Sequence, residues 1–196
     1  MRKRTNSKRG FSLIEALVVV GIALVMFAIA VPSFLQAYRS YQLTNAAEQV
    51  SGILKATRSA AIRLNTSVNC VIQGAAGPTV IWADSNLPVN DGIRQASEPE
   101  ILLSGNVNLV QPGIVPNAGG LPAAVGVPVI LATSPVNGVD AFDGRGAANP
   151  AAPAVSVLYV GNTALPAIGY RAVVLMPSGS IQIWSSDNAG NWHKLS

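Results

Sequence analysis

The chain has 196 residues, of which 49% are hydrophobic and 11% are charged, with one cysteine and one histidine. A single cysteine excludes an intrachain disulfide, and a single histidine argues against a catalytic triad or a histidine metal site. Five of the 13 basic residues precede Phe11, which leaves eight basic and nine acidic residues in the rest of the chain. The formal charge of +4 therefore belongs to the N-terminus, and it says nothing about the partners of the folded part.

An apolar run, FSLIEALVVVGIALVMFAIAV, follows the basic leader MRKRTNSKRG. Its 21 residues would form a helix of about 31 Å, which is enough to cross the hydrocarbon core of a bilayer. Under the positive-inside tendency, the leader stays in the cytoplasm and the chain after about Tyr38 lies across the membrane. Pro32 removes one amide donor, so it is expected to end or kink this helix.

Glu15 is the only residue of the apolar run that can carry a charge. Inserting a carboxylate at that depth costs about 2.5–3.5 kcal/mol on insertion scales, so Glu15 requires an interaction partner or a functional role. One interpretation is an ordinary membrane anchor whose glutamate reaches the interface. The other is that Glu15 has a function of its own.

Residues 33–65 are predicted to form an amphipathic helix that Asn65 ends. Apolar positions at alternating spacings of four and three draw a stripe along one face of this helix, with Thr57 as its polar member. The Thr57 hydroxyl can bond to the preceding turn. The stripe consists of Leu43, Ala47, Val50, Leu54, Thr57, Ala61 and Leu64.

The remainder, residues 66–196, is predicted to be a head rich in strands. Short segments rich in Val, Ile and aromatic residues are bounded by turn residues, and a Pro-Ser-Gly turn joins the last two of them into a hairpin. Cys70 is expected to be a small buried hydrophobe, and residues 112–154, rich in Pro and Gly, a long loop with room for one strand. A long helix followed by antiparallel strands is an α+β domain. The predicted strands are 68–73, 79–83, 100–104, 107–110, 127–132, 155–160, 170–176 and 180–185.

The stretch KRGFSLIE, followed by the apolar run and Pro32, resembles the class III signal of type IV prepilins and pseudopilins. The resemblance implies that the prepilin peptidase cuts after Gly10 and methylates the new N-terminus at Phe11. It also implies that Glu15 pairs with the terminal amine of a neighbouring subunit, and that the Pro32 region belongs to the assembly helix. An unpaired member of such a buried charge pair would cost several kcal/mol, so Glu15 would set the register of assembly.

The same resemblance implies a pilin-like fold, in which the long N-terminal helix packs on an antiparallel β-sheet head. It implies a bacterial inner-membrane protein with a single pass and a cytoplasmic N-terminus, whose head is periplasmic or lies in an extracellular filament. Its expected partners are the prepilin peptidase, other pilins or pseudopilins in a filament, and the inner-membrane assembly platform. No cofactor and no metal are expected.

Three later stretches, RSAAIRLNTSVNCVI, FDGRG and VVLMPSGSIQIW, are similar to the GspH/FimT group, which contains H-type pseudopilins of type II secretion and FimT minor pilins. This resemblance implies a structural subunit rather than an enzyme, with initiation or the filament tip as its more specific roles. The implied organisation is a leader at 1–10, a membrane and filament-core helix at 11–32, an amphipathic helix at 33–65, and the head.

A DNA-binding minor pilin of a competence pilus is the alternative function. Some FimT proteins linked to DNA uptake carry a Gly-Arg-x-Arg motif at the final turn, but residues 179–182 here read GSIQ and lack both arginines. The net charge near −1 beyond the leader also weakens the electrostatic term that drives DNA binding, so no nucleic-acid partner is expected. Arg145, Arg171 and Lys194 are the weak candidates.

Calcium is the remaining chemical alternative. Asp140 and Asp143 in DAFDG, or Asp187 in SSDNAGN, have oxygen atoms that could ligate it. Turn formation explains these aspartates better. His193, near the C-terminus, is expected to be exposed.

Overall fold

The computed structural model describes residues 12–74, 78–103, 106–126, 130–132, 137–148, 155–162, 164–187 and 189–196. A long helix, α1 (Leu13–Leu64), is followed by strands and short helices. The chain divides into two units, Met1–Tyr38 and Arg39–Ser196, and α1 contributes to both. The second unit is the head. Its α1 residues pack on antiparallel sheets, so the predicted α+β, pilin-like class is confirmed.

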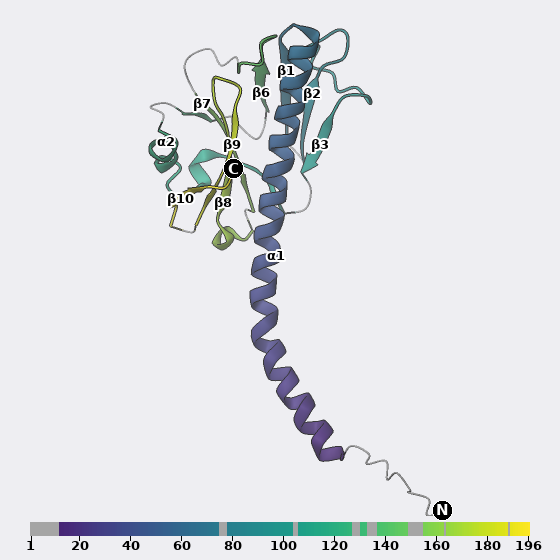
Figure 1. Ribbon diagram of the computed structural model, residues 1–196, viewed down its shortest axis with the longest axis vertical. Coiled ribbons are helices and arrows are strands. Elements are labelled where there is room, and N and C mark those ends of the chain that lie inside the picture. Colours follow the sequence, from purple (N-terminus) through teal and green to yellow (C-terminus); the bar gives the residue numbers. More distant parts are fainter. Residues whose placement is uncertain are drawn as a thin grey trace, which may run out of the picture. The chain divides into compact units, whose positions relative to one another are not determined.

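The strands of the head form two sheets; Figure 1 shows β2 and β3 of the first sheet on one side of α1, and β8, β9 and β10 of the second on the other. The first has the order β3-β2-β1-β6, and the second has the order β10-β9-β8-β7-β4, with β5 also pairing with β7. Only the β5–β7 pair is parallel among the described strands. The first sheet consists of β1 (Val68–Gln73), β2 (Thr79–Asp84), β3 (Glu100–Leu103) and β6 (Asn137–Phe142). The second consists of β4 (Asn108–Val110), β5 (Ile130–Ala132), β7 (Val155–Gly161), β8 (Tyr170–Leu175), β9 (Ile181–Ser186) and β10 (Trp192–Lys194).

The eight predicted strands are confirmed, with small differences at their ends; residues 104 and 127–129 lie outside the described residues. The predicted 112–154 loop is wrong in part, because it contains β6 and the short helices η1 (Pro112–Ile114) and α2 (Gly120–Val125). β6 has a sequence of low strand propensity, NGVDAF, but it pairs with β1 over all six residues. β10 and a second short helix, η2 (Pro166–Ile168), were also not predicted.

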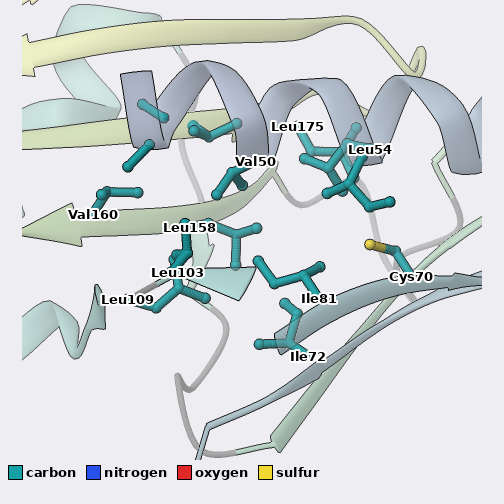
Figure 2. Close-up of a cluster of buried hydrophobic side chains, with 14 of the residues drawn as sticks. Val50, Leu54, Cys70, Ile72, Ile81, Leu103, Leu109, Leu158, Val160 and Leu175 are labelled. Carbon is teal, nitrogen blue, oxygen red and sulfur yellow. The ribbon is translucent and has the colours of Figure 1, made fainter. Parts of the chain in front are cut away.

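One hydrophobic core joins α1 to both sheets (Figure 2). Val50 and Leu54 of α1 meet Cys70 and Ile81 from the first sheet and Leu175 from the second. The predicted α1 stripe is confirmed, because all of its members except the last, Leu64, are buried. Thr57 satisfies its hydroxyl within the helix, by donating to the carbonyl of Ile53 at 2.9 Å.

The end of α1 is fixed by Asn65, as predicted. Asn65 has a positive φ of 48°, which an asparagine tolerates better than most residues. Its N–H donates to the Ile62 carbonyl, and the N–H of Thr66 donates to the Ala61 carbonyl, both at 3.2 Å. These two bonds form a Schellman motif, which satisfies carbonyls that the end of a helix leaves open.

Pro32 was expected to end or kink the helix, and the first of these two alternatives is wrong. Pro32 lies inside α1, which continues for 32 residues to Leu64. A proline removes one hydrogen bond to the preceding turn, and here the regular helix on both sides outweighs that loss. Residues 13–32 and 33–64 therefore lie in one continuous helix.

Candidate functional site

The predicted processing site lies directly before the start of α1. Gly10 and Phe11 are outside the described residues, while Leu13 begins the helix. Glu15 lies in the first turn and is exposed, and the first helical hydrogen bond joins the Ala16 N–H to the Ser12 carbonyl at 3.1 Å. An acidic residue in the first turn complements the positive end of the helix dipole. Glu15 therefore lies four residues after Phe11, where cleavage would create a new amine.

The first unit exposes apolar side chains on all faces of α1. Leu13 is 83% exposed, Leu24 64% and Ile29 75%. This is the one described helix that is long and apolar enough to cross a membrane. A helix that is apolar all round needs an apolar environment, either lipid or other helices. Gly21 has open space around it, so another helix can approach closely there.

Three stretches that carry the subfamily resemblance meet at one place in the head, which we call the α1-end junction. It consists of Arg58 on α1, Gly146 in the turn after β6, and Gly179 in the β8–β9 hairpin. The Nε of Arg58 donates to the Gly146 carbonyl at 2.8 Å. The Pro177 carbonyl accepts the N–H of Ala148 at 3.0 Å, which ties the hairpin to the same turn. The sequence did not predict that these segments touch.

Glycines are required at this junction. Gly146 and Gly179 have positive φ values of 78° and 77°, which side-chain-bearing residues rarely adopt. A Cβ on Gly179 would lie against the Gly146 carbonyl and 2.9 Å from the Arg58 Nε. A Cβ on Gly146 would lie 2.7 Å from the Cδ1 of Ile62. The two glycines therefore allow the turn, the hairpin and α1 to approach closely.

Two of the three weak nucleic-acid candidates do not lie at this junction. Arg171 is buried, with Nε donating to the Thr44 hydroxyl at 3.1 Å and Nη2 donating to the Ser40 hydroxyl at 2.9 Å. Burial lowers the pKa of the Arg171 guanidinium. Arg171 thus ties β8 to α1, and a role in a surface patch is wrong for it. Lys194 is exposed on β10, the edge strand of the second sheet.

Arg145 is placed differently, because it lies between two glycines that contact the end of α1. A Cβ on Gly144 would be 2.8 Å from the Asn65 backbone, and Gly146 contacts Ile62 and Arg58. Arg145 itself is exposed. The 143–147 turn therefore holds this arginine beside the last turns of the helix.

The turn interpretation of two candidate calcium ligands is confirmed. The Oδ1 of Asp143 accepts the N–H groups of Arg145 and Ala147, both at 2.9 Å. Asp187 accepts from the side chain and the backbone of Asn191, and these bonds hold its pKa below the usual range. Within the described residues, no three His, Cys, Asp or Glu side chains gather as a metal site.

Asp140 differs from these aspartates because it is buried in the head. It faces Cys70 across the β1–β6 pair, and its Oδ2 has no hydrogen-bond partner among the described residues. Burial raises the pKa of Asp140, and burial also raises the pKa of the Cys70 thiol to about 12. Cys70 is therefore the small buried hydrophobe that was predicted, and an unreactive one. His193 is exposed, as predicted.

The comparisons with known proteins bear on the N-terminal segment. Residues 5–31 match the family described as the prokaryotic N-terminal methylation motif. The motif supports a type IV pilin-like protein. It indicates a substrate of the prepilin peptidase that assembles with other pilins, and so a structural subunit rather than an enzyme. The apolar helix fits anchoring in a membrane. The comparisons with curated proteins and with solved structures gave no match.

Proposed function

We propose that this pilin-like protein is a minor pilin or pseudopilin of the GspH/FimT type. It is a structural subunit of a type IV pilus or a type II secretion pseudopilus, with a role in initiation or at the tip. Residues 1–10 are its cytoplasmic leader, and the first part of α1 spans the inner membrane and later lines the filament core. The head lies in the periplasm or in an extracellular filament.

The observation that carries this proposal is the part of α1 that lies in the first unit. It is apolar throughout and has one carboxylate, Glu15, in its first turn. The large apolar side chains of α1 from Leu13 to Leu35 are all exposed. In the waiting subunit lipid covers this surface, and in a filament the helices of neighbouring subunits replace the lipid. The helix is thus suited to both environments without refolding.

Glu15 makes the contact between subunits specific. Cleavage after Gly10 places the amine of Phe11 four residues before Glu15. A neighbour displaced along the helix axis can bring its own Phe11 amine to this carboxylate. The pair adds little net stability in an apolar bundle, but an unpaired charge there costs about 3–5 kcal/mol. That difference selects one axial offset between neighbours.

The α1-end junction supports the subfamily assignment. The three stretches that resemble the GspH/FimT group are far apart in the sequence, yet Arg58, Gly146 and Gly179 contact one another in the head. Three similar stretches that contact one another in the fold support the subfamily assignment more strongly than three unconnected ones.

The test is the amount of Glu15→Ala protein in filaments sheared from cells. The variant should be cleaved normally, because Glu15 lies beyond the cut, but its amount in filaments should fall at least about tenfold, since the neighbour's amine is left unpaired. Glu48→Ala is the matched control, because Glu48 is an exposed glutamate on the head part of the same helix. Normal amounts of Glu15→Ala in sheared filaments would contradict the role of Glu15.

A further inference from the structure

One face of α1 lines a groove in the head, which we call the amide groove. Its volume is about 420 Å³, and ligand pockets usually measure about 300–1,000 Å³. Every described residue that lines it belongs to the second unit. Four polar side chains come from α1, at spacings of three, three and four residues that keep them on one face. They are Arg39, Gln42, Asn45 and Gln49.

The opposite wall of the amide groove includes the ends of two edge strands. β3 is an edge strand of the first sheet, and β4 is an edge strand of the second. Leu102 and Leu103 line the groove at the end of β3, and Val107 lines it directly before β4. Edge strands have N–H and C=O groups that their own sheet does not pair, and such edges accept extended chains. This wall is therefore suited to an extended ligand.

The amides of the groove are free to bind a ligand. Gln42, Asn45 and Gln49 are exposed, and their side chains form no hydrogen bond with a described residue. Asn162 also lines the groove but is only 5% exposed. Its Oδ1 accepts the N–H of Ala164 at 3.0 Å, while its Nδ2 has no hydrogen-bond partner within the described residues. Asn162 can therefore donate to a ligand from a fixed position.

Arg39 gives the groove one positive end. It is the single charged residue among the described residues that line the groove. It forms no ion pair in the part of the chain that the structure describes, where Arg94 pairs with Glu100. Glu48 is close to Gln49 in the sequence but does not line the groove. The guanidinium of Arg39 is thus available to a carboxylate of a ligand.

We propose that the amide groove binds an extended polypeptide segment of another protein, with one carboxylate of that segment beside Arg39. A peptide backbone has one donor and one acceptor at each residue, and a carboxamide supplies both. The row from Arg39 to Gln49 spans about 15 Å of helix, which is the length of about four or five extended residues. Apolar side chains of the segment would contact Leu102 and Leu103. This inference concerns the head alone and is independent of the proposed filament function.

The composition of the groove favours a peptide over other polymers. No aromatic side chain is among the described residues that line it, so a nucleobase has no flat surface on which to stack. A single cation is also too little for a phosphate backbone. Carboxamides can bind sugar hydroxyls as well, so a carbohydrate is the competing ligand that the experiment must test.

The experiment exposes the immobilised full chain, in non-ionic detergent, to a random library of acetylated hexapeptides with free C-terminal carboxylates. Retained peptides are identified by mass spectrometry, resynthesised with a fluorescent label and titrated by fluorescence anisotropy. The peptides bound by the original protein should share a carboxylate and an apolar side chain. Gln42→Ala/Gln49→Ala should weaken their binding about tenfold, because it removes two hydrogen-bonding amides.

The matched control is Gln73→Ala/Gln111→Ala, which removes two exposed glutamines of the head that do not line the groove. It should change the affinity less than about twofold. Unfolding of each variant, followed by tryptophan fluorescence, establishes that the heads are equally stable.

Arg39→Gln tests the position of the carboxylate. Replacing the carboxylate of a bound peptide by an amide should weaken its binding to the original protein about tenfold, since a charge-assisted contact is lost. The same replacement should change binding to Arg39→Gln less than about twofold. This coupling identifies Arg39 as the partner of the carboxylate.

Three outcomes would overturn the proposal. The first is that no retained peptide depends on Gln42 and Gln49 more than on the control glutamines. The second is an equal effect of the amide replacement on the original protein and on Arg39→Gln. The third is displacement of the peptides by tri-N-acetylchitotriose at a lower concentration than by unlabelled peptide, which would assign the groove to a carbohydrate.

Discussion

The two parts of α1 have the same backbone and opposite surroundings. In the part before Arg39, Leu24 is 64% exposed, and charged residues are absent from Leu13 to Tyr38 apart from Glu15. In the part from Arg39 onward, Leu54 is fully buried, and polar residues occupy the outer face. One continuous helix thus carries two apolar patterns.

The difference shows what each part requires. The later part has a stripe that its own sheets cover, so its stability comes from within the chain. The earlier part is apolar all round and no described residue of the chain covers it, so its environment must come from lipid or from other helices. The same amino-acid type therefore serves folding in one part and membrane insertion or assembly in the other.

The largest expected effect comes from making one substitution in both parts. Leu54→Ala should lower the free energy of unfolding of the head by about 2–5 kcal/mol, because it leaves a cavity in the core. Leu24→Ala should leave the stability of the head unchanged within about 0.5 kcal/mol. Urea unfolding in detergent, followed by the fluorescence of the tryptophans in the head, measures both. Similar losses would remove the distinction between the two parts.

A substitution of Arg171 tests whether the hydrogen bonds between β8 and α1 stabilise the head. It bonds to Ser40 and Thr44 at the start of the buried stripe. Arg171→Met should therefore cost about 1.5–3 kcal/mol in the same unfolding experiment, since hydrogen bonds to a charged group are lost. Arg94→Met is the control, and it should cost less than about 1 kcal/mol because Arg94 pairs with Glu100 at the surface. A smaller loss of unfolding free energy for Arg171→Met than for Arg94→Met would contradict a stabilising role of the bonds from Arg171 to α1.

The smallest effect concerns pH and is confined to the head. Burial raises the pKa of Asp140 in the folded state, so the folded state holds its proton more tightly than the unfolded state. The stability that this proton provides is present below the unfolded pKa and is lost as the pH rises through the folded pKa. Asp140→Asn, which keeps the shape without the charge, should raise the stability by about 1 kcal/mol at pH 7.

At pH 4 the same variant and the original protein should have nearly equal stabilities. Thermal melting at the two pH values gives the comparison. A lower melting temperature of Asp140→Asn at pH 7 would mean that the ionised carboxylate is stabilised in the fold, contrary to its burial.

Local patterns predicted most of the elements, because hydrophobic periodicity is a local signal. The α1 stripe, the end of the helix at Asn65 and the hairpin at Pro-Ser-Gly could all be identified from neighbouring residues. β6 could not, since NGVDAF has little strand propensity and forms a strand only because β1 offers it six partners. A local rule also failed at Pro32, because a proline was expected to end or kink the helix and the helix continues past it.

The site residues divide in the same way. The Gly10 to Glu15 segment was recognisable because its information lies in consecutive residues. The α1-end junction was not, because Arg58 bonds to Gly146, which lies 88 residues further along the chain. Arg171 was assigned to the wrong environment, since no sequence signal distinguishes a buried arginine bonded to helix hydroxyls from an exposed one.

The central claim is that the exposed apolar part of α1 becomes the N-terminus of a filament subunit. The most direct measurement is the intact mass of the protein recovered from sheared filaments. The account predicts a chain that begins at Phe11 and carries one added methyl group. A chain that still contains the leader, or one cut elsewhere than after Gly10, would contradict it.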